Sequence, residues 1–126
     1  MINQINSNTQ TVQGKLDCRV LSASSLTGDD VYNPQGEKLG NIKELMLDIE
    51  NGTVCYAVLS FGGFLGLGEK LFAVPWNALE IDTINKRFLL DASEERLKNA
   101  PGFDADHWPN MADPSWERSI QSHYVN

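Results

Sequence analysis

Two short apolar runs, separated by a glycine-rich stretch, dominate the hydrophobic pattern of this chain. The first covers residues 53–61, is rich in β-branched and aromatic residues, and holds neither proline nor a charged residue. The second covers residues 71–74 and is stopped by Pro75. Runs this short and this apolar predict β-strands that are buried on both faces. We therefore expect the chain to be organised around these two strands and the connection between them.

The connection between the two runs combines glycine with large apolar residues. Its glycines are Gly62, Gly63, Gly66 and Gly68, and its apolar residues are Phe64, Leu65 and Leu67. Glycine supplies the positive φ angles or the close backbone approach that a tight connection needs. A solvated loop would carry polar residues between the glycines, so we expect this loop to pack against another surface.

Weaker patterns predict the remaining elements. Short strands are expected at residues 19–26, 30–32, 79–82 and 87–90, with a turn at Asn33–Gly36 and a hairpin joining the last two strands. Ser93 is expected to cap a short helix over Glu94–Asn99. Asp113 and Pro114 suit the cap and first position of a helix that ends near Tyr124.

The segment Lys38–Glu50 carries two patterns at once. Its apolar residues between 42 and 49 have the spacing of one helix face, and Asn41 with Glu44 fits a capping box. A strand is the alternative, because an Asn-Gly pair follows at residues 51 and 52, and this pair is typical of β-hairpin turns. The strand would need a bulge near residues 43 and 44, where the two-residue period is broken. The local pattern favours neither structure.

Composition indicates one soluble globular domain. The chain has 126 residues, of which 41% are hydrophobic and 21% are charged. No apolar run is long enough to span a bilayer, and residues 1–13 lack the basic and apolar regions of a secretory signal. Cys18 and Cys55 fit no metal-binding spacing, and Cys55 is expected to be a small core residue. These features predict a cytoplasmic protein with free thiols and no membrane insertion.

Charge argues against nucleic acid as a direct partner. The net charge is −7, and acidic and basic residues are spread along the chain rather than gathered in a charged tail. An acidic surface repels phosphate backbones, and the sequence shows no basic stripe. We therefore expect no direct binding of DNA or RNA.

Patterns that would indicate catalysis or a cofactor are incomplete. Gly63 and Gly68 have the spacing of a phosphate-binding loop, but Glu69 stands where that loop needs lysine. Asp104, Asp106 and His107 are polar residues of the tail that match no metal-binding loop. The only histidines lie in the tail, and no serine lies in a nucleophile-elbow motif. The sequence therefore predicts no enzyme activity, no cofactor and no metal.

A set of short motifs nevertheless resembles the PRC-barrel domain family. The motifs are Leu26-Thr27-Gly28, Val31-Tyr32, Gly36-Glu37-Lys38-Leu39-Gly40, the positions Ile42, Leu45, Asp48 and Gly52, then Tyr56-Ala57-Val58 and Val74-Pro75-Trp76. The family is named for the cytoplasmic barrel of the photosynthetic reaction centre H subunit, and a related barrel ends a ribosome maturation factor. The loop at 61–70 and the tail at 101–116 are similar to small stand-alone bacterial members. The membrane helix of the reaction centre subunit has no counterpart in this chain.

The resemblance implies a fold and a division of the chain. The fold is an all-β, mostly antiparallel small barrel of about six strands with a short helical C-terminal tail. Residues 1–18 are expected to be disordered, 19–92 to form the barrel domain, and 93–126 to form a tail whose short helices pack on the barrel. The resemblance also implies that Lys38–Glu50 is a bulged strand.

The family resemblance implies a non-catalytic adaptor in the cytoplasm that binds a protein partner. A factor linked to RNA processing or ribosome assembly is one alternative, and a small-molecule sensor with a pocket at the barrel mouth is another. The apolar residues of the glycine loop favour a homodimer, because a symmetric contact would cover them. The candidate contacts with a partner or second copy are Phe61, Phe64, Leu65, Leu67, Trp108 and Trp116. The two tryptophans have a second interpretation, in which they hold the tail on its own barrel.

Overall fold

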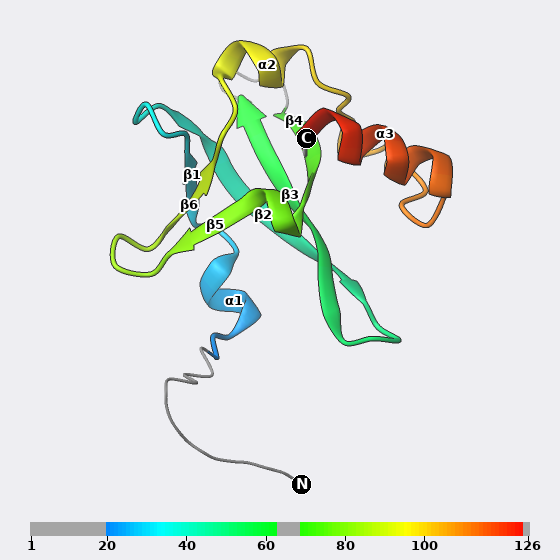
Figure 1. The fold of residues 1–126 in the computed structure, drawn as a ribbon, viewed down its shortest axis with the longest axis horizontal. Coiled ribbons are helices and arrows are strands. Elements are labelled where there is room, and N and C mark those ends of the chain that lie inside the picture. The colour runs from blue at the N-terminus through cyan, green and yellow to red at the C-terminus, as the bar shows by residue number, and fades with distance from the viewer. Residues whose placement is uncertain (1–19, 63–68, 125–126) are drawn as a thin grey trace, which may run out of the picture.

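The computed structural model describes residues 20–62 and 69–124, and within them the chain forms a six-stranded half-barrel with short helices around it (Figure 1). The strands are β1 (Asp30–Tyr32), β2 (Lys38–Asp48), β3 (Thr53–Gly62), β4 (Glu69–Pro75), β5 (Leu79–Asp82) and β6 (Arg87–Leu90). The helices are α1 (Ala23–Leu26), α2 (Glu94–Lys98) and α3 (Pro114–Tyr124), with a 3-10 turn η1 (Trp76–Ala78) between β4 and β5. No helix among these residues is long and apolar enough to cross a membrane.

The sheet order is β4-β3-β2-β1-β6-β5, and only the β1–β6 pair is parallel. The other neighbouring pairs are antiparallel, so the expected small, mostly antiparallel β-fold is confirmed. The parallel pair arises because β5 and β6 form a hairpin of their own, which reaches the sheet along β1. β5 and β4 therefore stand at the two edges of the sheet.

The ambiguous segment at 38–50 is a strand. β2 runs from Lys38 to Asp48, and its register against β3 shifts between Ile42 and Glu44. This is the bulge that the broken two-residue period requires. Long-range pairing decides the structure here, because β3 offers a full set of backbone partners and an isolated helix of this length is marginal in water.

Within the segment expected as a strand at 19–26, residues 23–26 form a short helix instead, and residue 19 lies outside the described residues. α1 begins after Ser22, and the side chain of Ser25 donates a hydrogen bond to the carbonyl of Ser22 at 2.7 Å. A serine run gives no β-type alternation, and its hydroxyls bond the local backbone rather than a neighbouring strand. The apolar Leu26 at the end of α1 packs against the core of the half-barrel.

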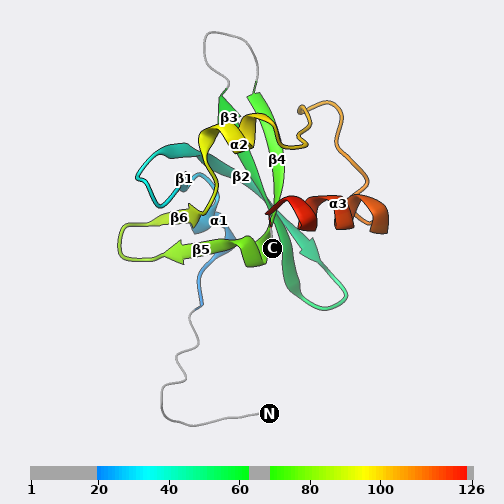
Figure 2. The same ribbon diagram turned by 45° about the horizontal axis from the view of Figure 1, so that its top comes forward.

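The sheet buries apolar side chains on both of its faces. The inner core lies in the concave side and is made of Val31, Leu39, Ile42, Ala57, Leu59, Phe72, Val74, Phe88 and Leu90, with Ala92, Leu97 and Ala100 from the tail. The outer cluster lies where α3 covers β3 and β4 (Figure 2) and is centred on Tyr56, Ala73 and Ile120. Burial on both faces explains why the sequence of β3 is almost continuously apolar.

Candidate functional site

The β5–β6 hairpin places the last strand of the sheet at an open edge. Leu79 lies opposite Leu90 and Ile81 lies opposite Phe88. Because Leu90 and Phe88 belong to the inner core, Leu79 and Ile81 share that inner face. Glu80 therefore lies on the outer face of the strand. Among residues 20–62 and 69–124, β5 has β6 as its one strand neighbour, so its far edge is free of strand pairing.

The turn after β5 is held by the carboxylate of Asp82. Its Oδ1 accepts hydrogen bonds from the amides of Ile84 and Asn85 at 3.2 and 3.1 Å. Its Oδ2 accepts from Asn85 Nδ2 at 2.8 Å and from Arg87 Nε at 3.2 Å. Hydrogen bonds from Asn85, and to a smaller extent the hydrogen bond and positive charge of Arg87, hold the pKa of Asp82 below its usual range. The turn is thus a built structure that presents Ile84 and Lys86.

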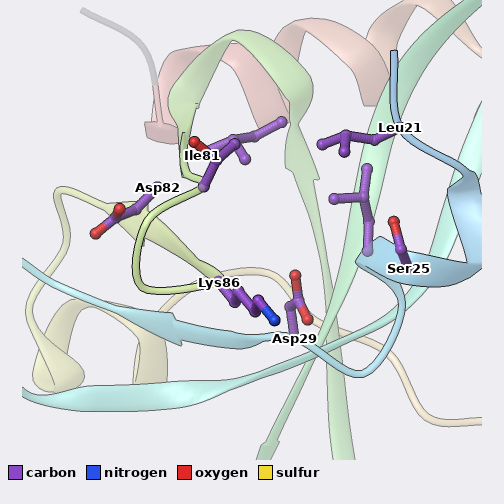
Figure 3. A pocket seen from close by; sticks show the side chains of 8 residues that line it. Leu21, Ser25, Asp29, Ile81, Asp82 and Lys86 are labelled. Atoms are coloured by element: carbon purple, nitrogen blue, oxygen red, sulfur yellow. The ribbon is translucent and has the colours of Figure 1, made fainter. Parts of the chain in front are cut away.

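A pocket of about 330 Å³ lies between this hairpin and α1 (Figure 3). It is lined by Leu21, Ser25, Leu26, Asp29, Ile81, Asp82, Thr83 and Lys86. The close view shows Leu21 and Ile81 on opposite walls, while the side chains of Lys86 and Asp29 approach each other at the far end. Burial and the neighbouring Asp30 raise the pKa of Asp29, and the ammonium of Lys86 opposes that rise. The pocket is apolar in its middle and charged at one end.

Exposed aliphatic side chains gather around this pocket. Val20 is 81% exposed, Leu21 50%, Ile81 36% and Ile84 89%. Leu21 and Ile81 line the pocket itself, Val20 precedes Leu21, and Ile84 lies in the adjoining turn. We call the free edge of β5 together with these four residues the edge surface. Leu21 and Ile81 line one pocket and are both exposed, and exposed apolar groups that lie together cost free energy in water and can mark a site of interaction.

The opposite edge of the sheet, at β4, pairs with the tail of the same chain at Leu71. The amide of Leu71 in β4 donates to the carbonyl of Phe103 at 2.8 Å, and the amide of Phe103 donates back to the carbonyl of Leu71 at 2.8 Å. Pro75, which has no N–H to offer, ends the same strand. At Leu71 and Pro75 the chain thus protects β4 in the way that natural edge strands are protected, whereas no strand of the described residues pairs with the far edge of β5.

The candidate contact residues predicted from the sequence lie in different surroundings. Phe61 packs edge-on against the core residue Phe72, with ring centroids 6.0 Å apart. Trp116 packs edge-on against Tyr56 at 5.2 Å within the outer cluster. Trp108 is 39% exposed. Phe64, Leu65 and Leu67 lie outside the described residues.

Trp108 is only partly free for a partner. Its ring lies 5.0 Å from that of Phe103, and its indole N–H donates to the carbonyl of Ala105 at 3.0 Å. Phe103 in turn reaches the outer cluster. Both tail tryptophans therefore make contacts that hold the tail against its own sheet, directly for Trp116 and through Phe103 for Trp108.

Other chemically interesting residues take structural positions. Asp104 accepts hydrogen bonds from the amide of Asp106 at 3.0 Å and pairs with His107 Nδ1 at 2.7 Å, which forms a local turn. Bonding to His107 is the main cause that lowers the pKa of Asp104. Across the described parts of the chain, no group of three or more potential metal ligands comes together.

The expectation that Cys55 is a core residue is wrong, because its side chain is exposed. Cys55 stands near the start of β3, and the register against β2 shifts between Met46 and Leu47 at this point. The β2–β3 hairpin also projects away from the rest of the sheet at this end (Figure 1). An apolar strand sequence does not reveal that one end of the strand leaves the core.

The edge surface was missed by sequence reasoning. The run Leu79-Glu80-Ile81-Asp82 predicts a strand with one apolar and one acidic face, and the structure confirms that strand. The same alternation would occur in a strand paired on both sides, so it does not distinguish an edge from an interior position. Within the edge surface, Ile84 is the residue whose type suggests a contact, because it is aliphatic and exposed in an otherwise polar turn.

The fold and the sequence together define the class of this protein. The family model of the PRC-barrel domain matches residues 19–97, and the chain belongs to that family. The family resemblance stated from the motifs is thereby confirmed.

A solved structure described as the 16S ribosomal RNA processing protein RimM of Pseudomonas aeruginosa is similar to this chain at 18% identity. The similarity has a TM-score of 0.41 and covers 60% of this chain and 45% of that one, so the chain spans less than half of its length. No curated protein matches the sequence. We transfer no function from the RimM structure.

Proposed function

We propose that this chain is a non-catalytic protein-interaction module of the PRC-barrel type, an adaptor that acts in the cytoplasm by binding another protein. The edge surface is the observation that carries the proposal. An open strand edge offers backbone groups to a partner, and the four exposed aliphatic side chains beside it offer apolar area. Backbone pairing at a sheet edge combined with pockets for side chains is one of the modes by which proteins recognise other chains.

The distribution of apolar surface supports this proposal. The tail covers the outer face of β3 and β4 through Ile120 and Trp116, and it pairs with the edge of β4 through Phe103. The outer face at β3 and β4, and the edge of β4 at Leu71, are thus in contact with the tail of the same chain. Among the described residues, the edge of β5 that faces away from β6 pairs with no other strand.

We also propose that the adaptor is a homodimer, with the loop at 61–68 in the contact. The argument comes from the sequence, in which Phe64, Leu65 and Leu67 stand between glycines. A charge-free apolar loop on an acidic chain would gain most from burial against its own symmetry copy. The loop joins β3 to β4 in the chain, whereas the edge surface belongs to β5 and α1, so the two proposals concern different segments.

The pocket favours a second candidate, a small-molecule sensor. Its volume of about 330 Å³ is at the small end of the range for ligand sites. Asp82 contributes little to recognition, because its oxygens are engaged in the turn. Asp29 and Lys86 remain as a charged pair that a small polar ligand could bridge.

Affinity capture of the tagged full chain from its native cells, with quantitative mass spectrometry, tests the adaptor proposal. We expect one protein to be retained in near-equal amount with the chain, and to stay bound after RNase treatment. Loss of the retained protein with RNase would support the RNA-linked alternative instead. Absence of any retained protein, together with a rise in melting temperature on adding a metabolite mixture, would support the sensor.

A further inference from the structure

We propose that the free edge of β5 binds an extended segment of a partner protein in which aliphatic residues alternate with lysine or arginine. This inference rests on the proposed adaptor function, since it names the surface and the kind of partner for that function. Three features of one strand carry it: a backbone edge with no strand partner among the described residues, an apolar pocket on the inner face, and the exposed carboxylate of Glu80 on the outer face.

The free backbone edge of β5 requires a partner segment in an extended conformation. One edge of the strand pairs with β6, and among the described residues no strand pairs with the other. The amide of Leu79 closes the turn η1 by donating to the carbonyl of Trp76. From Glu80 onward, the backbone N–H and C=O groups that point away from β6 are positioned to pair with one more strand. A segment that adds to a sheet edge gains backbone hydrogen bonds whatever its side chains are.

The inner face of β5 selects an aliphatic side chain. Ile81 points to this face and forms one wall of the pocket, with Leu21 opposite it (Figure 3). A strand added beside β5 places every second side chain on the same face, next to Ile81 and toward α1. An aliphatic side chain in this place would cover Leu21 and Ile81 and would exclude water from both.

The outer face of β5 selects a cation. Glu80 is exposed there, and no salt bridge engages it in the described parts of the chain. Asp82 is on the same face two residues later, and Arg87 offsets its charge in part. Opposite charges on adjacent strands stabilise their pairing and like charges destabilise it. A lysine or arginine beside Glu80 therefore fits, and an acidic residue does not.

A second copy of this chain does not suit the edge. Residues opposite one another in neighbouring strands lie on the same face. Two antiparallel β5 strands that overlap well and keep their faces aligned would place Glu80 opposite either Glu80 or Asp82 of the other copy. Both registers bring like charges together, on a chain whose net charge is −7. The edge therefore favours a different, basic chain.

Titration of the ¹⁵N-labelled full chain with two capped pentapeptides tests the proposal by NMR. The first peptide alternates valine with lysine and the second alternates valine with glutamate. We expect the lysine peptide to shift amide signals of β5, the turn at 83–86 and α1. The glutamate peptide should bind about tenfold more weakly, because its charges repel Glu80. A lysine peptide with proline at its centre should lose most of its affinity, because one backbone donor is missing.

Charge reversal on the strand sharpens the test. Glu80→Lys replaces an exposed residue and should invert the preference, so that the glutamate peptide binds better than the lysine peptide. Glu50→Lys is the matched control, since it reverses an exposed acidic residue in the β2–β3 turn and should leave both affinities unchanged. Far-UV circular dichroism of both variants checks that the strand spectrum is kept.

Three results would overturn the proposal: equal affinity for the two peptides, shifts that map away from β5, or no shift at about 5 mM peptide. Any of them would leave the adaptor function standing as long as affinity capture still retains a protein after RNase treatment. The partner would then bind another surface. If the capture fails and the peptides bind as expected, the edge recognises such segments without a stable cellular partner.

Discussion

Gly40 shows how one residue decides whether β2 can pair with β3. A Cβ atom at this position would lie 2.0 Å from the carbonyl oxygen of Ser60. The neighbour is backbone, so it has no side-chain rotamer with which to move away. β2 and β3 are neighbouring interior strands that both contribute to the inner core, so a shift between them disturbs that core.

Gly40→Ala should therefore destabilise the fold by about 2 kcal/mol or more, as overpacking does. Urea denaturation followed by circular dichroism measures the change. Gly36→Ala is the control, because its Cβ would meet nothing within 4 Å, and its φ of +84° leaves only the smaller backbone cost. Equal losses in the two variants would show that the contact with Ser60 does not limit pairing.

His123 makes the tail sensitive to pH. Burial and the nearby Arg96 guanidinium hold the pKa of His123 below its usual value of 6.5, although the backbone contact with Arg96 acts the other way. Its Nε2 is buried with no hydrogen-bond partner among the described residues. As pH falls below 6.5, the unfolded chain takes up a proton before the folded chain does, so stability is lost.

His123→Gln should accordingly reduce the fall in melting temperature between pH 7 and pH 5.5. Scanning calorimetry at the two pH values measures this difference. His107→Gln removes an exposed histidine that pairs with Asp104, and it should not reduce the fall. A pH dependence that stays the same without His123 would contradict the assignment.

At the scale of elements, α3 acts as a cover for the outer face of β3 and β4. Ile120 is 1% exposed and is the buried anchor of this helix. Trp116 and Tyr124 pack beside it in the outer cluster. The tail is thus a part of the folded core rather than an appendage.

Ile120→Ala should cost about 2–5 kcal/mol, which is the range for truncating a buried isoleucine to alanine. Equilibrium denaturation in urea gives the value. Ile49→Ala is the matched control, because Ile49 is 88% exposed and its truncation should change stability by less than about 0.5 kcal/mol. A loss below about 1 kcal/mol for Ile120→Ala would mean that α3 is only loosely docked.

The sequence predicted the elements whose local pattern is unambiguous. Asp113 and Pro114 mark the start of α3, and Ser93 caps α2 by accepting a hydrogen bond from the amide of Arg96 at 3.0 Å. The apolar runs of β3 and β4 also form strands as expected. Local patterns were insufficient at 38–50 and at 19–26, where pairing partners or side-chain bonds to the backbone decide the structure.

The interaction surface could not be predicted in the same way. Ile81 and Glu80 form an ordinary alternating strand in the sequence, and their availability depends on which strand lies beside them. Residues 20–62 and 69–124 supply no second strand beside β5, because the parallel pairing of β6 with β1 places β5 at the edge. Leu21 joins Ile81 only because α1 folds beneath the hairpin. These contacts depend on the order of the strands and on the position of α1, which a local sequence pattern does not specify.

At the scale of the whole molecule, the homodimer can be tested without knowledge of the partner. Light scattering after size exclusion should give the mass of two chains at tens of micromolar protein. Phe64→Asp should reduce this to one chain while the strand spectrum is kept, because a charge in a buried contact is costly and a charge on a solvated loop is not. A mass of one chain for the natural protein would contradict the dimer.

The central claim is that this chain works by binding another protein at the edge surface, and photo-crosslinking in its native cells tests it most directly. A photoreactive amino acid at position 84 should yield one light-dependent adduct with a protein, resistant to RNase. The same group at position 49, on the projecting β2–β3 hairpin, should not yield this adduct. Adducts of equal yield from both positions, or none from position 84, would contradict the claim.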